Sequence, residues 1–265
     1  MSAKAIVVGV IPSRYASHRL PAKPLVDLLG KPLVQRVYEQ ASKSRLLDRI
    51  VVATDDVRIE DAVRRFGGDV ILTSQEIASG SDRVAAVAMD MAGDIFVNIQ
   101  GDEPLIAPET IDQGVQLLLD DTSAPVGTLV KQISSQEELL NPNVVKVVLS
   151  HEGYAMYFSR SIIPHIRSEA ESRWLERHTF YKHIGLYVFR RKFLLQYAAL
   201  PVSRLEKAEK LEQLRVLEAG YKMKAGITTY ESIPIDTPED VVRVVEILHQ
   251  ASVHAQTGDQ WQKTI

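Results

Sequence analysis

The first 120 residues alternate between short apolar runs and amphipathic stretches, and this order restricts the fold more than any other feature. Residues 5–11 and 50–53 are apolar runs of the length of a buried strand. Ile59, Val63 and Phe66 then recur with the spacing of one helical face. A repeated strand–helix order implies a parallel sheet with helices on both faces. We therefore expect an α/β fold with a mostly parallel, Rossmann-like sheet flanked by helices.

The second half has a different pattern. Strand-like runs at 144–149, 154–158 and 184–189 are separated by polar loops. Farther on we expect one helix over 203–218, a strand at 227–230 and a last helix that starts near residue 237. The whole predicts a single α/β domain over 1–250 with an inserted mixed-strand lobe at about 126–190. A polar C-terminal tail is expected over 251–265.

Charge and composition exclude several classes of function. The chain has 265 residues and a formal net charge of -3, so it lacks the basic excess of a nucleic-acid-binding protein. It has no cysteine, which excludes disulfides and thiolate chemistry and suits a reducing compartment. No apolar run approaches the ~20 residues of a membrane span, and no signal peptide is evident. We expect a cytoplasmic protein without membrane insertion.

A basic loop follows the first predicted strand. Residues 12–24 contain Arg14, Arg19 and Lys23 and no acid. The carboxyl end of such a strand is where an open α/β sheet usually binds its ligand. Clustered cations repel one another unless an anion lies among them, so we infer a polyphosphate ligand. Neither G-x-G-x-x-G nor a P-loop occurs, so this loop would bind the phosphates instead; the alternative is a solvated surface loop.

Two aspartates are candidate metal ligands. Asp102 follows the strong strand signal at 95–100, where its carboxylate could hold Mg²⁺ against a polyphosphate. Asp236 lies one residue ahead of Thr237, the expected helix cap, and its side chain is therefore free to point elsewhere. We hypothesise that the two carboxylates converge on one metal ion. The alternative is that each only stabilises a turn or a helix start.

Several short motifs occur together and in a recognisable order. They are Ile11-Pro12-Ser13-Arg14, Arg19-Leu20-Pro21-Ala22-Lys23-Pro24-Leu25, Ser79-Gly80-Ser81-Asp82-Arg83, Gln100-Gly101-Asp102-Glu103-Pro104, Tyr157-Phe158-Ser159-Arg160, His183-Ile184-Gly185-Leu186-Tyr187, Leu211-Glu212-Gln213-Leu214-Arg215 and Asp236-Thr237-Pro238-Glu239-Asp240. Over residues 6–248 the chain resembles the 3-deoxy-manno-octulosonate (KDO) cytidylyltransferases, also called CMP-KDO synthetases. Ala22 departs from the glycine expected there in many members, and residues 75–78 are less polar than in some relatives.

The resemblance implies a fold of the nucleotide-diphospho-sugar transferase type and a specific reaction. CMP would pass from CTP to the anomeric hydroxyl of KDO, with release of pyrophosphate, in lipopolysaccharide biosynthesis. The implied cofactor is Mg²⁺ on Asp102 and Asp236, and the implied assembly is a homodimer formed through the inserted lobe.

The resemblance also assigns site residues. The catalytic residues would be Arg14, Lys23, Asp102 and Asp236. The nucleotide would be bound by Pro12, Ser13, Arg14, Lys23, Ser79, Gly80, Ser81, Arg83 and Asp102. The sugar acid would be bound by Gln100, Arg160, His183, Tyr187, Glu212 and Gln213.

Two other readings of the chain stay open. One is a cytidylyltransferase for a related acidic sugar, such as 8-amino-KDO or sialic acid. The other is a catalytically idle nucleotide-binding protein that keeps the fold. Taken singly, His183 and Tyr187 are also compatible with purely structural roles.

Overall fold

The computed structural model describes residues 4–16, 19–77 and 79–257, with side chains described to residue 251. Ser17 and His18 of the basic loop, together with Ala78, lie outside the described residues. The strands are β1 (Val7–Ser13), β2 (Arg49–Thr54), β3 (Val70–Leu72), β4 (Ile95–Asn98), β5 (Val126–Gln132), β6 (Lys146–Leu149), β7 (Ala155–Ser159), β8 (Tyr181–Arg190) and β9 (Met223–Ile227).

The α-helices alternate with these strands in the first half and cluster in the second. They are α1 (Leu33–Ala41), α2 (Val57–Arg65), α3 (Gly80–Asp90), α4 (Pro108–Asp120), α5 (Gln136–Leu140), α6 (Trp174–Arg177), α7 (Arg191–Ala199), α8 (Arg204–Glu209), α9 (Leu214–Glu218) and α10 (Pro238–Thr257). Short 3-10 turns, η1 (Lys23–Leu25) and η2 (Glu171–Arg173), complete the described elements.

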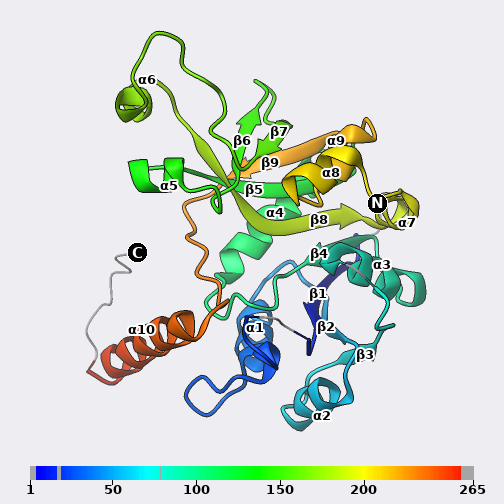
Figure 1. Ribbon diagram of the computed structural model, residues 1–265. Coiled ribbons are helices and arrows are strands. Elements are labelled where there is room, and N and C mark those ends of the chain that lie inside the picture. Colours follow the sequence, from blue (N-terminus) through cyan, green and yellow to red (C-terminus); the bar gives the residue numbers. More distant parts are fainter. Residues whose placement is uncertain (1–3, 17–18, 78, 258–265) are drawn as a thin grey trace.

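The nine strands of the described residues belong to one sheet, in the order β3-β2-β1-β4-β8-β5-β9, with β6 and β7 joined to it through β8 (Figure 1). β1 pairs in parallel with β2 and β4, and β2 with β3. The long strand β8 runs antiparallel to both β4 and β5, so it joins the parallel half to the strands of the 126–190 segment. The predicted mostly parallel α/β sheet with added mixed strands is confirmed.

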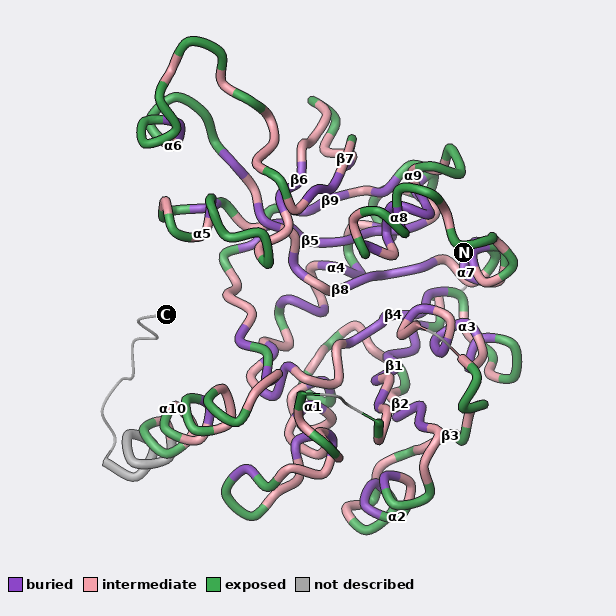
Figure 2. The backbone as a smooth tube through the Cα atoms, in the orientation of Figure 1, coloured by how far each residue is buried: buried purple, intermediate pink, exposed green. Residues whose placement is uncertain are grey.

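Helices cover both faces of the sheet. Because side chains alternate along a strand, Val7 and Ile11 of β1 face one core while Val8 and Val10 face the other. The first core is closed by α1, α2, α4 and α10, and the second by α3, α7 and α9. Figure 2 shows the buried residues concentrated along the central strands. No described helix is long and apolar enough to cross a bilayer.

Three sequence-based expectations for the second half were wrong in detail. The segment 203–218 forms two short helices, because a capping box of Ser203 and Glu206 starts α8 and Lys210, at φ 56°, ends it. The strand expected at 227–230 ends at Ile227. The last helix continues to Thr257, so the segment 251–257 of the expected tail is helical.

Candidate active site

The loops that follow β1 and β4 lie side by side, because these two strands are parallel neighbours with Val10 opposite Asn98. The contact is close enough to require glycine: a Cβ atom on Gly101 would lie 2.6 Å from the carbonyl oxygen of Pro12. This packing carries Asp102, the next residue, to the edge of the basic loop.

The Lys23 ammonium joins the two candidate metal ligands. Its Nζ lies 2.8 Å from Oδ2 of Asp102 and 3.0 Å from Oδ1 of Asp236. Burial alone lowers the pKa of Lys23, but the charges and hydrogen bonds of the two aspartates outweigh it and raise that pKa above its ordinary value. The expected convergence of Asp102 and Asp236 is therefore present, and their role as metal ligands stays a prediction.

Asp236 reaches this position because another residue stabilises the start of α10. Asp240 Oδ2 accepts hydrogen bonds from the amides of Asp236 and Thr237, and from the Thr237 hydroxyl. The Asp236 side chain is thereby left free, as its place ahead of the cap predicted. Arg19 also contacts it, with Nη2 3.0 Å from Oδ2. The cations of the basic loop are thus partly neutralised by acids from distant parts of the chain.

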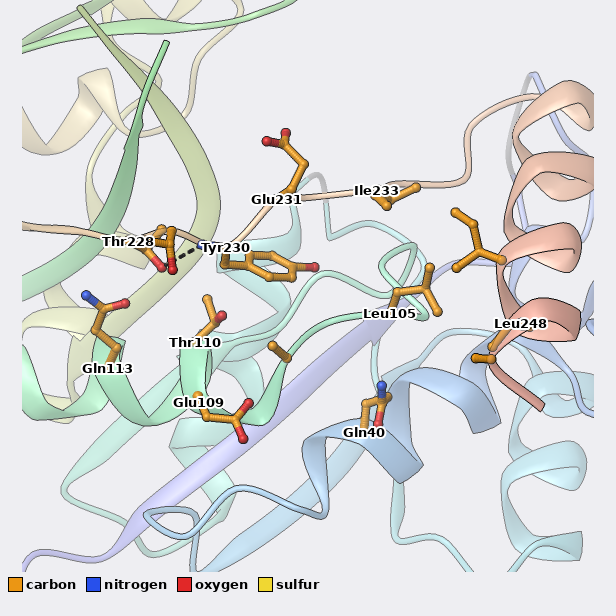
Figure 3. A pocket seen from close by; sticks show the side chains of 14 residues that line it. Gln40, Leu105, Glu109, Thr110, Gln113, Thr228, Tyr230, Glu231, Ile233 and Leu248 are labelled. Atoms are coloured by element: carbon orange, nitrogen blue, oxygen red, sulfur yellow. Dashed lines mark hydrogen bonds between the residues drawn. The ribbon is translucent and has the colours of Figure 1, made fainter. Parts of the chain in front are cut away.

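A cavity of about 360 Å³ opens beside this cluster and is lined by predicted catalytic and phosphate-binding residues. The lining comprises Pro12, Ser13, Arg14, Ala16, Arg19, Lys23, Pro24, Gln100, Gly101, Asp102 and Asp236. Arg14 borders the cavity while its Nη2 donates to the carbonyl of Ile77 at 2.7 Å. A larger cavity, about 610 Å³, lies between α1, α4 and α10 and contains none of the predicted site residues (Figure 3).

The departure at Ala22 has a backbone consequence. Ala22 adopts φ 55° and ψ 30° at the start of η1, directly before Lys23. This left-handed conformation is the one that glycine adopts at little cost and that a Cβ atom disfavours by roughly 1–2 kcal/mol. The chain therefore keeps the turn that presents Lys23 despite the alanine.

The donor set fits a magnesium ion. Among the described residues no group of three or more acids and histidines could hold a metal. The predicted site offers two carboxylates, Asp102 and Asp236, both within 3.0 Å of the Lys23 ammonium. Mg²⁺ commonly takes one or two carboxylates and fills its remaining positions with phosphate oxygens and water. The Lys23 ammonium lies between the two carboxylates, in the position that a bound metal ion would take. The residues present therefore fit the ion that the resemblance implies.

The predicted nucleotide-binding residues of α3 lie next to this cavity. Ser79 caps α3 by accepting a hydrogen bond from the amide of Asp82, and Ser81 Oγ accepts one from Asn98 Nδ2 at 3.2 Å. A Cβ atom on Gly80 would lie 3.5 Å from Asn98 Nδ2 and 3.8 Å from Pro12, so Gly80 adjoins the basic loop. The start of α3 and the loop after β1 therefore form adjoining walls.

Arg83 differs from its neighbours because it is fully buried. Its guanidinium donates to Asp55 Oδ2 at 2.9 Å and to the hydroxyl of Thr73. These bonds fasten α3 to the segments after β2 and β3. Direct contact between Arg83 and the nucleotide stays a prediction. In the structure this side chain holds α3 against the segments that contain Asp55 and Thr73.

Most of the predicted sugar-binding residues gather around β8. Gln100 Nε2 donates to the carbonyl of Gly185 at 2.8 Å, and the Tyr187 hydroxyl donates to Gln213 Oε1 at 3.0 Å. His183 Nε2 lies 2.8 Å from Thr128 Oγ1, and the rings of His183 and Tyr187 are 5.3 Å apart. This grouping joins β4, β8 and the start of α9.

Arg160 and Glu212 occupy different surroundings. The Arg160 guanidinium donates to the carbonyls of Glu209 and Pro142, and in the described part of the chain no hydrogen bond joins it to the other predicted sugar-binding side chains. Burial raises the pKa of Glu212, against the opposing effect of the Ser81 and Ser79 hydroxyls. Glu212 therefore faces the start of α3, where the nucleotide residues lie.

Several buried polar atoms of the predicted site residues and of Asn98 have no hydrogen-bond partner among the residues that the structure describes. They are Ser13 Oγ, Arg83 Nε, Asn98 Oδ1, Glu212 Oε2 and Gln213 Nε2. An unpaired buried polar atom costs roughly 1–3 kcal/mol, so a cluster of them marks where a ligand would bind. Sequence reasoning did not assign Asn98 to the site; the signal for it was an amide at the end of an otherwise apolar strand.

We expect His183 to make the folded protein less stable at acidic pH. Burial lowers the pKa of His183 to about 3, below its ordinary value near 6.5. Between these pH values the unfolded chain holds more protons on this residue than the folded chain does, so stability rises with pH across that window. The contribution of His183 to the free energy of unfolding should fall as pH decreases from 6.5, by up to about 1.4 kcal/mol per unit. The buried Glu103, whose pKa is raised, contributes with the opposite sign, so the comparison with a His183 variant isolates this residue.

Urea unfolding at pH 4.5–7 would measure this slope. In His183→Gln, which lacks the titrating ring, the slope should be smaller. Wild-type and variant curves that run parallel over the whole window would contradict the assignment.

The chain is similar to known cytidylyltransferases over most of its length. The Cytidylyltransferase family model matches residues 8–227. The 3-deoxy-manno-octulosonate cytidylyltransferases of Parabacteroides distasonis and Geotalea uraniireducens are 52% and 50% identical to the chain, each over 91% of it and over 97% and 98% of their own lengths.

Solved structures of similar fold include another cytidylyltransferase complex. The chain superposes with a TM-score of 0.87 and 42% identity on CMP:2-keto-3-deoxy-manno-octonic acid synthetase complexed with CTP, covering 93% of this chain and 100% of that one. At 12% identity and a TM-score of 0.59, 4-diphosphocytidyl-2C-methyl-D-erythritol synthase from Anaerococcus prevotii, which covers 92% of this chain and 99% of its own, shares the fold. The chain belongs to the cytidylyltransferase family, with the 3-deoxy-manno-octulosonate cytidylyltransferases as its relatives.

Proposed function

We propose that this chain transfers CMP from CTP to the anomeric hydroxyl of KDO, forming CMP-KDO and releasing pyrophosphate. The observation that carries the proposal is the Lys23 ammonium held between Asp102 and Asp236 at the mouth of an arginine-lined cavity. The sequence identity of about 50% to 3-deoxy-manno-octulosonate cytidylyltransferases supports the choice of substrates.

The chemistry needs positive charge more than it needs a strong nucleophile. KDO is itself an anion, and the α-phosphorus of CTP is shielded by negative oxygens, so electrostatic repulsion is the main obstacle. Arg14, Arg19 and Lys23 would bind the triphosphate and stabilise the charge that develops on pyrophosphate as it leaves. The unpaired hydroxyl of Ser13 is a further donor at the same wall of the cavity.

Asp102 and Asp236 would hold Mg²⁺. When bound, the ion supplies charge that offsets the phosphate oxygens and lowers the pKa of a coordinated sugar hydroxyl. Lys23, released from the two carboxylates, would be free to donate to a phosphate oxygen. The two aspartates would thus keep the lysine in place in the resting enzyme.

The sugar acid would be bound beside β8. Tyr187 and Gln213 offer a hydroxyl and an amide that already hydrogen-bond each other, and the Gln213 Nε2 donor is unpaired. His183, with its lowered pKa, would present a neutral ring to a sugar hydroxyl. The Arg160 guanidinium uses two of its five N–H donors on carbonyl oxygens, and its other donors could bind the sugar carboxylate.

The biological setting follows from the proposed reaction. CMP-KDO would serve lipopolysaccharide biosynthesis, and a cysteine-free chain suits the cytoplasm, where CTP is available. A homodimer formed through the 126–190 segment is part of the proposal. The second candidate is a cytidylyltransferase for 8-amino-KDO or sialic acid, since the residues that would contact the sugar are polar groups usable by several acidic sugars.

A pyrophosphate-release assay with CTP and Mg²⁺ tests the function. With KDO, 8-amino-KDO and sialic acid in parallel, we expect the highest kcat/KM for KDO. A clear preference for another sugar would support the second candidate. No release with any of the three would leave a protein that only binds nucleotides, and would contradict the proposal.

Asp102→Asn should reduce kcat about 100-fold or more while the protein still unfolds cooperatively, because it removes one carboxylate from the proposed metal site. Asp48→Asn is the matched control: Asp48 also pairs with a lysine, Lys4, but borders the opposite end of β1. Near-normal turnover in Asp102→Asn, measured at several Mg²⁺ concentrations, would remove Asp102 from the metal site.

A further inference from the structure

Glu103 is a buried carboxylate for which the proposed chemistry has no use. It follows Asp102 directly, and only 5% of it is exposed. Burial raises its pKa to about 7, with the Asp102 charge adding to the rise and hydrogen bonds from Ser232 and Tyr230 opposing it. Burying an acid is costly unless it is hydrogen-bonded, so the partners of Glu103 show what holds it there.

Those hydrogen bonds lead to the segment that carries Asp236. Glu103 Oε1 accepts one from the Ser232 hydroxyl at 2.6 Å, and Oε2 accepts one from the Tyr230 hydroxyl at 3.1 Å. The amide of Ile235 donates to the carbonyl of Asp102 at 2.9 Å. Residues 228–236, between β9 and α10, contain no helix or strand. Contacts of this kind, rather than regular structure, therefore fix the path of the segment.

The same segment is held from its other side. Glu231 pairs with Lys131 of β5 at 2.5 Å and with Lys182 of β8 at 2.6 Å. Figure 3 shows the side chains of Tyr230 and Glu231 on opposite sides of the segment. Tyr230 and Ser232 thus contact the loop after β4, and Glu231 contacts strands β5 and β8. Residues 228–236 are therefore held from both sides.

We propose that Glu103 is a positioning residue that, through Tyr230 and Ser232, holds Asp236 opposite Asp102 for a shared divalent cation. The proposal rests on the metal site of the proposed function. Two carboxylates that must approach each other repel, and a site that is held together before the metal arrives binds it more tightly. Groups that orient metal ligands typically affect metal affinity by 10–100-fold when they are removed.

The double variant Tyr230→Phe/Ser232→Ala removes both hydroxyls and leaves Glu103, Asp102 and Asp236 intact. The chain offers a matched control in Tyr154→Phe/Ser123→Ala. Tyr154 and Ser123 donate their hydroxyls to one carboxylate, Asp121, which lies beyond the end of α4 and outside the site. Both double variants thus lose one tyrosine and one serine hydroxyl from a shared acid.

The measurement is the calorimetric affinity of the full chain for CTP with Mn²⁺ and for CTP in EDTA, without sugar, so that no turnover occurs. The ratio of the two affinities reports how strongly metal and nucleotide cooperate. We expect Tyr230→Phe/Ser232→Ala to lower this ratio about tenfold, with the affinity for metal-free CTP changed by less than about twofold. The control should keep the wild-type ratio, and Ser232→Ala alone, the milder change, should lower it about threefold.

An unchanged ratio in Tyr230→Phe/Ser232→Ala, or an equal loss in the control, would overturn the proposal, as would a wild-type protein whose CTP affinity does not respond to Mn²⁺. The outcome is separable from that of the proposed function. If the affinity ratios of the variants change as expected but the wild-type protein forms no product with KDO, the role of Glu103 is supported and the proposed reaction is refuted. If the wild-type protein is active with KDO but Tyr230→Phe/Ser232→Ala keeps the wild-type affinity ratio, the reaction is supported and the role of Glu103 is refuted.

Discussion

Two carboxylates from residues 134 positions apart in the chain meet at one point, and the rest of the site depends on how their repulsion is offset. At a separation near 4 Å and an effective dielectric constant of 20, two like charges repel by about 4 kcal/mol. The Lys23 ammonium between Asp102 and Asp236 offsets this repulsion in the resting protein. The cation-rich loop and the acids thus stabilise each other, and a metal-bound triphosphate would bring both a cation and an anion to the cluster.

The sheet explains why these groups can meet at all. β1 and β4 are parallel neighbours, so the loops at their carboxyl ends are adjacent, and Gly101 lets them touch. β8 runs antiparallel beside β4 and brings Gly185 to Gln100. The predicted sugar residues therefore lie beside the predicted phosphate residues without a separate domain. Polar atoms of Ser13, Asn98, Glu212 and Gln213 have no partner within the described part of the chain, which fits a site that a ligand fills.

Much of this arrangement was predictable from local patterns. The strand–helix alternation predicted the parallel half of the sheet, and the position of Asp236 ahead of Thr237 predicted a side chain free of the helix cap. Long-range partners were not predictable. The basic loop contains no acid, yet its cations pair with Asp102 and Asp236. Arg83, in a motif that pointed to the nucleotide, is buried against Asp55 and Thr73. The segment 203–218 was expected as one helix, but Lys210 ends α8 with a left-handed backbone that the local sequence does not signal.

On this proposal, Asp102 and Asp236 form one cation site that Lys23 fills until metal and nucleotide arrive. A crystal structure of the protein with CTP and Mn²⁺, with the metal located by its anomalous scattering, tests this most directly. We expect one Mn²⁺ ion within bonding distance of both carboxylates, with the Lys23 ammonium moved onto a phosphate oxygen. A metal ion bound to CTP alone, with Lys23 still paired to both aspartates, would contradict it.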